Sequence, residues 1–306
     1  MGRNLETLET LNPCGDATLP QMASAEDLAP GLYLVATPIG NLEDITLRAI
    51  RVLKQADLIA CEDTRQTQKL LNHYGINTPT ISYHEHNEAA RAAELVEKLA
   101  QGSRIAVVTD AGTPGISDPG FRLVSLAIER GLPVVPIPGP AAFVSALVGA
   151  GLPVGSFSFR GFLSPKTGAR RRELEHVRNS MQTEIFYEAP HRILATLEDV
   201  LAILGPRRRI VVARELTKIH EEFLRGTAAQ VLDVIKSRGE MKGEIVLMIG
   251  PASEGETQAP ATSVRDRVQQ LMREEKLDEK SALKKAARER GISKSEAYRE
   301  WQVSSK

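Results

Sequence analysis

The stretch LYLVATPIGN at residues 32–41 decides how the fold is interpreted. Its first half, residues 32–36, is a short uninterrupted apolar run, which is typical of a parallel strand covered on both faces. Its second half, residues 37–41, contains a proline and a glycine and predicts a tight turn. In open parallel sheets, ligands bind outside the carboxyl ends of the strands. This turn is therefore a candidate part of a binding site.

Outward from this stretch, strand and helix patterns alternate, which predicts an α/β domain with a mostly parallel sheet. Gly75, Gly102 and Gly131 follow three of the predicted helices, where helix C-caps are expected. From about residue 157 the later strands follow each other more closely, and a mixed or antiparallel sheet is expected. The predicted strands are 32–36, 58–61, 105–108, 134–137, 157–160, 184–188, 209–213, 217–225 and 244–249. The predicted helices are 45–55, 64–74, 87–100, 120–130, 141–149, 168–179, 191–204 and 227–236.

The 306 residues thus divide into two α/β domains and a small C-terminal helical unit. The polar, proline-containing stretch 251–263 has the composition of a linker. The expected organisation is a flexible leader at 1–30, an N-terminal α/β domain at 31–152, a second α/β domain at 153–250, the linker, and a basic helical unit at 264–306.

Composition excludes several classes of protein. Lysine plus arginine (39) equals aspartate plus glutamate (39), so attraction to nucleic acid must come from local basic patches. Cys14 and Cys61 form no disulfide framework and no CxxC pair, as expected in a reducing cytosol. The segment 131–159 carries no charge, but its prolines and glycines interrupt any membrane-spanning helix. The leader lacks the pattern of a signal peptide. A cytoplasmic protein is expected.

Three turns rich in glycine and proline follow predicted strands, at 37–41, 110–120 and 138–140. Glycine lets the backbone approach a ligand closely, and proline lowers the ordering cost of binding. Each turn alone is explained as a tight connection between strand and helix. Together they predict a pocket, and since they contain no lysine or arginine, its ligand is not expected to be a polyphosphate.

These motifs resemble those of the tetrapyrrole-methylase-type family and, within it, the ribosomal RNA small subunit methyltransferase I subfamily. The motifs are TPIGNLEDI at 37–45, EDTR at 62–65, DAGTP at 110–114, SDPG at 117–120, PGP at 138–140, FYE at 186–188, ARELTK at 213–218 and KGE at 242–244. The resemblance implies an S-adenosylmethionine-dependent enzyme, usually a homodimer, which methylates the ribose 2′-hydroxyl of a cytidine in the decoding region of 16S rRNA. It also implies that the cofactor lies in the cleft between the two domains.

The resemblance also implies a set of cofactor-binding residues. They are Pro38, Asp110, Ala111, Gly112, Thr113, Ile116, Ser117, Ala141, Phe186, Tyr187, Ala213 and Gly243. A carboxylate such as that of Asp110 can accept hydrogen bonds from the polar hydrogens of such a ligand. Phe186 and Tyr187 are also explained as ordinary core residues of a strand.

For catalysis, Glu62 and Asp63 are the favoured candidates, because they directly follow the second predicted strand and so reach the ligand edge. A ribose hydroxyl is a poor nucleophile until its proton is removed. Asp63 is equally explained as the cap of the next helix. Glu188, Glu215, Lys218 and His84 are further candidates, and catalysis by orientation alone is an alternative.

Basic residues gather in two places that are candidates for RNA contact. One is the segment around 160–172, and the other is the C-terminal unit, where Tyr298 and Trp301 accompany the charges. The predicted RNA-binding residues are Arg65, Lys166, Arg170, Arg171, Arg172, Lys218, Lys284, Lys285 and Lys294. The run 207–209 is also basic and is explained as a solvated face. The C-terminal helices resemble a helix-turn-helix, but they could equally brace a dimer.

His84 and His86 suggest a metal site at first sight, since alternate residues of a strand share a face. A third ligand is not evident, so no metal is expected, and lining of the cleft or turn chemistry is favoured. Two other functions remain open. One is methylation of a tetrapyrrole, which would not need the basic segments. The other is a ribosome-associated RNA-binding module without catalysis, which would not need the turn at 110–120.

Overall fold

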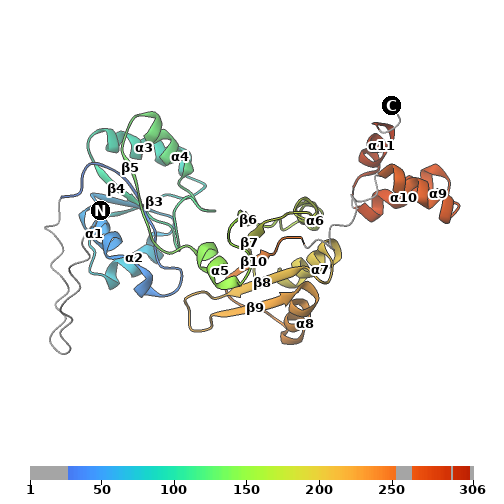
Figure 1. Cartoon of the computed structure of the whole chain (residues 1–306). Helices are drawn as coiled ribbons and strands as arrows, with labels where there is room; N and C mark the ends of the chain where they lie inside the picture. Colours follow the sequence, from blue (N-terminus) through green and yellow to red (C-terminus); the bar gives the residue numbers. More distant parts are fainter. Residues whose placement is uncertain (1–26, 253–263, 291, 304–306) are drawn as a thin grey trace, which may run out of the picture.

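The computed structural model describes residues 27–252, 264–290 and 292–303. It contains two five-stranded sheets, with helices around each, followed by a separate group of three helices (Figure 1). The predicted leader and linker lie for the most part outside the described residues. No helix of the described part of the chain is long and apolar enough to span a membrane.

The first sheet has the strand order β3-β2-β4-β1-β5, and all neighbouring strands are parallel. Helices α1 and α2 pack on one face and α3 and α4 on the other, so strands such as β1 are buried on both sides. The strands are β1 (Gly31–Val35), β2 (Leu58–Cys61), β3 (Thr80–Ser82), β4 (Arg104–Val107) and β5 (Val134–Ile137). The helices are η1 (Leu42–Asp44), α1 (Leu47–Gln55), α2 (Thr64–His73), α3 (Glu88–Ala100) and α4 (Phe121–Glu129).

The second sheet is mixed, with the order β6-β7-β10-β8-β9. β6 is parallel to β7, and the remaining pairs are antiparallel, as the short connections predict. One face is covered by α6, α7 and α8, and the other by α5. The strands are β6 (Phe157–Phe162), β7 (Thr183–Glu188), β8 (Arg209–Arg214), β9 (Glu222–Thr227) and β10 (Ile245–Ile249). The helices are α5 (Ala142–Ala150), α6 (Thr167–His176), α7 (Ile193–Leu204) and α8 (Ala228–Arg238).

Helix α5 connects the two halves. It follows the last strand of the first sheet, yet Ala146, Leu147 and Ala150 pack against β7, β8 and β10 of the second. The uncharged segment 131–159 thus contains the strand β5, a turn and the helix α5, of which one face packs on the second sheet, rather than a membrane span. Ile39, from the loop after β1, belongs to the same apolar cluster, which therefore contains residues of both halves.

Three details of the sequence prediction are wrong. The short strand β3, Thr80–Ser82, is absent from the predicted strands. The strand predicted at 217–225 begins only at Glu222, because Glu215 and Thr217 adopt a left-handed backbone conformation (φ 52° and 64°) that ends strand pairing. The strand assumed for His84 and His86 is absent, since β3 ends at Ser82 and residues 85–87 form a turn.

The C-terminal unit is formed by α9 (Val264–Glu274), α10 (Glu279–Arg290) and α11 (Lys294–Val303). It has a small core of its own, in which Val268 and Leu271 of α9 meet Ala282 and Ala286 of α10 and Ala297 of α11. Small alanines at the contact let the helices approach closely. The predicted pair of helices is therefore part of a three-helix unit.

Candidate active site between the two sheets

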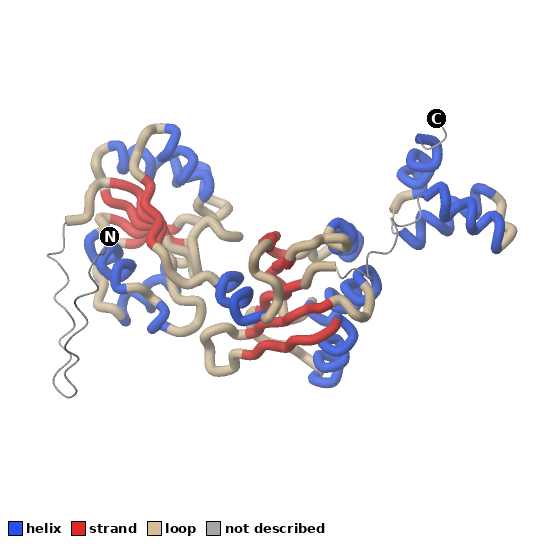
Figure 2. Tube along the Cα trace, in the orientation of Figure 1, coloured by secondary structure: helices blue, strands red, loops and turns tan. Residues whose placement is uncertain are grey.

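A cavity of about 400 Å³ lies between the carboxyl edge of the first sheet and one face of the second. Figure 2 shows that long loops from both halves occupy this region. The first half contributes residues from the loops after β1, β2, β4 and β5. The lining residues are Ile39, Glu62, Thr109, Asp110, Ala111, Gly112, Thr113, Ile116, Ser117, Asp118, Ala141, Ala142, Phe162, Tyr187, Glu188, Ala189, Pro190, Leu216, Glu244, Ile245 and Val246.

The structure brings together the three turns that the sequence singled out. Thr37 and Gly112 exchange two backbone hydrogen bonds, with N–O distances of 2.9 and 3.0 Å. The Thr113 hydroxyl donates to the carbonyl oxygen of Pro140 at 3.1 Å. Gly112 has φ +90°, a conformation that side chains with a Cβ rarely adopt. The wall of the cavity is therefore preformed by backbone contacts.

Three carboxylates, those of Glu62, Asp110 and Asp118, line the same side of the cavity. Burial raises the pKa of Glu62, and the neighbouring Asp118 and Asp110 raise it further. Burial likewise raises the pKa of Asp118, although the Thr109 hydroxyl donates to its carboxylate at 2.7 Å. Like charges in a partly dry site disfavour ionisation. This side of the cavity therefore favours a cationic ligand.

Asp63 does not line the cavity. Its carboxylate caps α2 by accepting from the Arg65 backbone N–H at 2.8 Å, and it also pairs with the Arg65 guanidinium at 2.8 Å. These bonds to Arg65 lower the pKa of Asp63 to about 2. The backbone N–H of Asp63 donates to Asp110 at 3.1 Å, which orients the Asp110 carboxylate. The structure thus supports the helix-cap explanation for Asp63 and leaves Glu62 as the candidate base.

The residues assigned from the second half separate into two groups. Tyr187 lines the cavity, whereas Phe186, the preceding residue of β7, is 2% exposed and packs in the core under α6, α7 and α8. Adjacent strand residues point to opposite faces, so both cannot reach the ligand. Ala213 is buried beneath the cavity in the α5 face of the sheet. Phe186 is therefore a core residue.

Pro38 and Gly243 are also outside the lining. Pro38 lies in the turn between Thr37, which bonds to Gly112, and Ile39, which lines the cavity. A Cβ on Gly243 would lie 2.4 Å from the side chain of Glu215, so glycine is required there for packing. The remaining assigned residues line the cavity, namely Asp110, Ala111, Gly112, Thr113, Ile116, Ser117, Ala141 and Tyr187.

Several lining residues were not assigned from the sequence. Asp118 and Glu244 lie within the quoted motifs, and these motifs were the signal that could have found them. Glu188, a further candidate for catalysis from the sequence, also lines the cavity. Glu188 is almost fully buried, accepts from the Thr196 hydroxyl at 2.6 Å and pairs with Arg192 at 2.8 Å. Its role is therefore largely structural. Phe162 carried no signal, because a bulge in β6 decides where it points.

Several of the predicted RNA-binding residues are engaged in ion pairs inside the protein. Arg170 is buried and pairs with Asp199 at 2.6 Å, and Arg171 pairs with the same carboxylate at 2.7 Å. Lys218 pairs with Glu215 at 2.8 Å and with Glu244 at 3.2 Å. Because Arg170 is buried and its guanidinium is paired inside the protein, its role is structural.

Other basic residues remain exposed. Lys166 and Arg172 lie on or next to α6, and Lys284 and Lys294 lie in the C-terminal unit. Lys285 is paired with Glu275 at 2.5 Å, and Arg65, although 87% exposed, is paired with Asp63.

In the run 207–209, Arg208 is buried and donates to the carbonyl oxygens of Gly250 and Arg178. The solvated-face explanation therefore applies to Arg207 and Arg209 alone.

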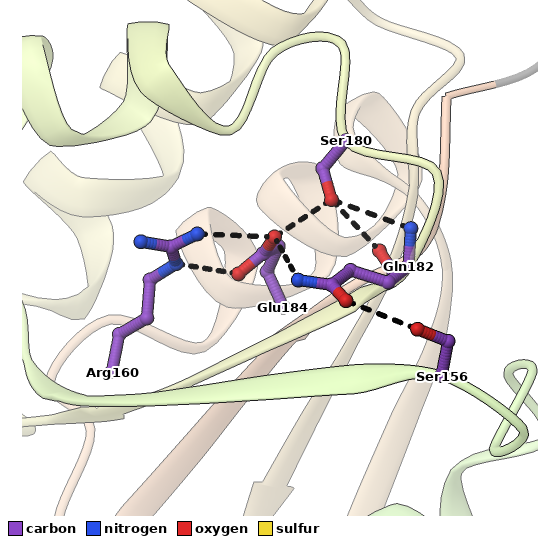
Figure 3. Close-up of polar contacts among 5 residues, drawn as sticks. All are labelled: Ser156, Arg160, Ser180, Gln182 and Glu184. Carbon is purple, nitrogen blue, oxygen red and sulfur yellow. Dashed lines mark hydrogen bonds and ion pairs between the residues drawn. The ribbon is translucent and has the colours of Figure 1, made fainter.

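Arg160, in the basic segment 160–172, belongs to a polar network around β6 and the start of β7 (Figure 3). Its guanidinium faces the buried carboxylate of Glu184, with N–O distances of 2.5 and 3.3 Å. Ser180 and Gln182 also donate to Glu184, at 2.7 and 3.3 Å. The hydrogen bonds hold Arg160 in one orientation although its side chain is 42% exposed.

The rings of His84 and His86 lie edge to face, with centroids 6.0 Å apart. The backbone N–H of His84 donates to the Asn87 side chain at 2.9 Å, which closes the turn after β3. Within the described ranges, no group of three or more histidine, cysteine, aspartate or glutamate side chains is arranged to hold a metal ion. Turn chemistry explains this motif.

Comparisons with known proteins agree with this architecture. The family model for tetrapyrrole (corrin/porphyrin) methylases matches residues 31–232. The chain is 47% identical over 275 residues to a protein of Halalkalibacterium halodurans named Ribosomal RNA small subunit methyltransferase I, covering 87% of this chain and 93% of the relative. The chain belongs to the tetrapyrrole methylase family. An Escherichia coli O157:H7 protein of the same name is 44% identical over 282 residues, covering 92% of this chain and 98% of the relative.

Solved structures share the fold at low sequence identity. The uroporphyrin-III C-methyltransferase of Thermus thermophilus, solved in complex with S-adenyl homocysteine, superposes with a TM-score of 0.51 at 18% identity. The match covers 72% of this chain and 97% of that one. The two-sheet architecture of this family is therefore present in this chain.

Proposed function

We propose that this protein transfers a methyl group from S-adenosylmethionine to the 2′-hydroxyl of a cytidine in the decoding region of 16S rRNA, in the cytoplasm. The observation that carries the proposal is a preformed cavity, whose acidic lining includes Glu62, Asp110 and Asp118, between the two sheets of a chain that matches rRNA small subunit methyltransferases over most of its length. The substrate is 16S rRNA, either free or within the small ribosomal subunit.

The cavity residues suit S-adenosylmethionine. Its volume of about 400 Å³ lies within the usual range for small-molecule sites, ~300–1,000 Å³. The sulfonium and the ammonium group of the cofactor are cations, and they relieve the repulsion among Glu62, Asp110 and Asp118. The apolar side chains of Ile39 and Ile116 supply surface against which an adenine ring packs. The backbone at Gly112 allows close approach.

Bound S-adenosylmethionine supplies an electrophilic methyl group on a sulfonium and leaves as S-adenosylhomocysteine when the hydroxyl oxygen attacks in line. The chain must orient this oxygen and take its proton. Glu62 is the residue proposed for the proton, because it lines the cavity and burial raises its pKa toward the working pH. Such tuning makes a carboxylate a better general base. Asp63, with its pKa held near 2 by Arg65, is poorly suited.

RNA contact is proposed for the exposed cations that remain after the internal ion pairs are set aside. Lys166 lies at the start of α6 and Arg172 lies within it, and Lys284 and Lys294 are exposed in the C-terminal unit. Phosphate contacts of this kind give affinity that falls steeply with salt. No metal is required for this reaction.

A homodimer is proposed from the exposed apolar side chains around the first sheet and α5. Phe121 of α4 is 80% exposed, Ile128 is 62% exposed, and Val148 of α5 is 73% exposed. Large exposed apolar side chains often mark protein interfaces. A second copy of the chain is the occupant that the family resemblance implies.

The test uses purified protein, S-adenosylmethionine with a labelled methyl group, and small ribosomal subunits from cells that lack the protein. We expect label in the ribose of one decoding-region cytidine, and calorimetric binding of the cofactor that Asp110→Asn weakens. Label in an added tetrapyrrole but not in RNA would overturn the substrate. Absence of cofactor binding would favour a module without catalysis.

A further inference from the structure

A second, smaller cavity of about 290 Å³ lies next to the cofactor cavity, between β6, β7 and α6. It is lined by Arg160, Phe162, Glu173, His176 and Phe186. Phe162 is common to both cavities, so they adjoin at this side chain. A ligand in the smaller cavity therefore lies beside the cofactor cavity.

The position of Phe162 results from a bulge in β6. Phe159 is paired with Ile185, and Phe162 is paired with Tyr187, so β6 carries one more residue than β7 between these pairs. Gly161 has φ +67°, and a Cβ at this position would lie 3.4 Å from the Ser117 hydroxyl oxygen. Bulges beside active sites redirect side chains. Here the bulge leaves Phe162 57% exposed instead of packed in the sheet.

Phe162 is supported from behind by other aromatic side chains. Its ring meets Tyr187 edge to face at 5.4 Å, and Tyr187 meets Phe159 at 4.9 Å. Phe159 in turn stacks on Phe143 of α5 at 4.5 Å. A half-exposed ring that is held by such contacts is a rigid platform for a planar ligand. In single-stranded RNA, unstacked bases are commonly bound on aromatic rings of this kind.

The polar lining of the smaller cavity has a defined pattern of donors and acceptors. Arg160, held by Glu184, presents a guanidinium that only donates (Figure 3). The Glu173 carboxylate accepts from the Ser164 N–H at 3.0 Å and has further acceptor capacity. The His176 Nδ1 lies 2.6 Å from the Arg172 carbonyl oxygen, which can only accept, so Nδ1 carries the proton. In the neutral ring Nε2 is then an acceptor.

This pattern distinguishes the two pyrimidine bases of RNA. Cytosine presents an amino group that donates to acceptors such as Glu173 and His176, and its carbonyl and ring nitrogen accept from a cation such as Arg160. Uracil presents a carbonyl where cytosine has the amino group and would leave the acceptors unpaired. We propose that the smaller cavity holds the base of the target nucleotide, stacked on Phe162, and selects cytosine over uracil.

The proposal rests on the methyl transfer to RNA proposed above. With the base in the smaller cavity, the attached ribose extends past Phe162 toward the cofactor cavity and Glu62. The exposed Lys166 and Arg172 lie on the same helical segment as Glu173 and His176, where they can contact flanking phosphates.

The test compares kcat/KM for small subunits that carry either cytidine or uridine at the target position. Phe162→Ala should lower kcat/KM for the cytidine substrate about 5- to 150-fold, as expected for a lost base–aromatic stack. Phe162→Trp should retain activity, since it keeps a ring. Glu173→Gln keeps an acceptor for the Ser164 N–H but adds a donor, so it should lower the preference for cytidine over uridine at least about 10-fold.

Two matched controls lie on the same elements. Phe157 of β6 is 45% exposed, and Glu175 of α6 pairs with Arg178, but neither lines either cavity. Phe157→Ala and Glu175→Gln should leave kcat/KM and base preference unchanged. Calorimetry with S-adenosylmethionine and sedimentation accompany each variant, because loss of cofactor affinity or of a dimer would explain reduced activity without a base site.

Photocrosslinking gives a readout that does not depend on a folded variant. A substrate with 5-iodocytidine at the target position should crosslink the unaltered protein within 157–176 or at Phe186, the segments that line the smaller cavity. A crosslink elsewhere, unchanged kcat/KM in Phe162→Ala, or an unchanged base preference in Glu173→Gln would overturn the proposal. If the unaltered protein transfers no methyl group to either substrate, the proposed function itself fails. If Phe162→Ala and Glu173→Gln still methylate RNA like the unaltered protein, and the crosslink lies outside the smaller cavity, the base site is rejected while the proposed function stands.

Discussion

The adjacent residues Phe186 and Tyr187 allow the assignment of the two faces of β7 to be tested with a matched pair of substitutions. Phe186 is 2% exposed and packs in the core under α6, α7 and α8. Truncation of a buried phenylalanine to alanine costs about 3–5 kcal/mol, from lost burial and the cavity that remains. At roughly 2–4 °C per kcal/mol for a protein of this size class, Phe186→Ala should lower the Tm by about 6–20 °C.

Tyr187→Ala should behave differently. Tyr187 is half-buried, and it contributes two edge-to-face aromatic contacts, each of which typically stabilises a protein by about 0.5–1.5 kcal/mol beyond its burial. We expect a smaller decrease in Tm than for Phe186→Ala. Because Tyr187 lines the cofactor cavity, we also expect the Kd for S-adenosylmethionine to rise at least about 10-fold, which corresponds to 1.4 kcal/mol.

The assays are calorimetric unfolding without ligand and titration calorimetry with S-adenosylmethionine at a temperature where both variants are folded. Tyr187→Phe is the control, since it keeps the ring and both aromatic contacts and should retain most of the affinity. If Phe186→Ala weakened cofactor binding as much as Tyr187→Ala at that temperature, the assignment of Phe186 to the core side would be refuted.

The remaining predictions concern the carboxylates and the turn at 110–120. Burial and its acidic neighbours raise the pKa of Glu62, so its protonated form is favoured in the folded state, and the favourable contribution to stability is lost as pH rises through this pKa. Glu62→Gln should therefore raise the ligand-free Tm at pH 8. The same variant should lower kcat for methyl transfer about 10²- to 10⁴-fold, because it lacks the proposed base. Asp63→Asn should leave kcat nearly unchanged. Asp199→Ala should lower the free energy of unfolding in urea by about 3–5 kcal/mol, because it leaves the buried Arg170 guanidinium uncompensated; a loss below 1 kcal/mol would contradict this. Gly112→Ala, at φ +90° but with nothing nearer than 3.5 Å to the added Cβ, should cost about 1–3 kcal/mol of stability through backbone strain and weaken cofactor binding measured by calorimetry.

Much of the candidate site could be predicted from the sequence, because its parts are local. The turns 110–120 and 138–140 directly follow apolar strand runs, and parallel strands place such turns at one edge of a sheet. The carboxylate of Glu62 was predicted to reach this edge for the same reason, and it lines the cavity. Short motifs of this kind keep their meaning because the geometry that they need is set within a few residues.

Other parts of the site depend on contacts between distant residues. The sequence does not distinguish Asp63 from Glu62 as a base, since the choice depends on which carboxylate caps α2 and pairs with Arg65. Nor does the motif FYE reveal which of its aromatic rings faces the cavity, because the pairing of β7 with β10 and the packing of α5 decide it. Arg170 looked like an RNA contact until its pairing with Asp199, 29 residues away, was visible.

The sequence by itself determined the alternation of strands and helices, the mixed character of the second sheet, and the turns that form the cavity wall. These features follow from hydrophobic periodicity, chain connectivity and the conformations allowed to glycine and proline. Only the tertiary structure decided which charges are neutralised inside the protein and where Phe162 points. Both depend on residues that are distant in the chain and on a one-residue bulge, and neither leaves a periodic or local pattern.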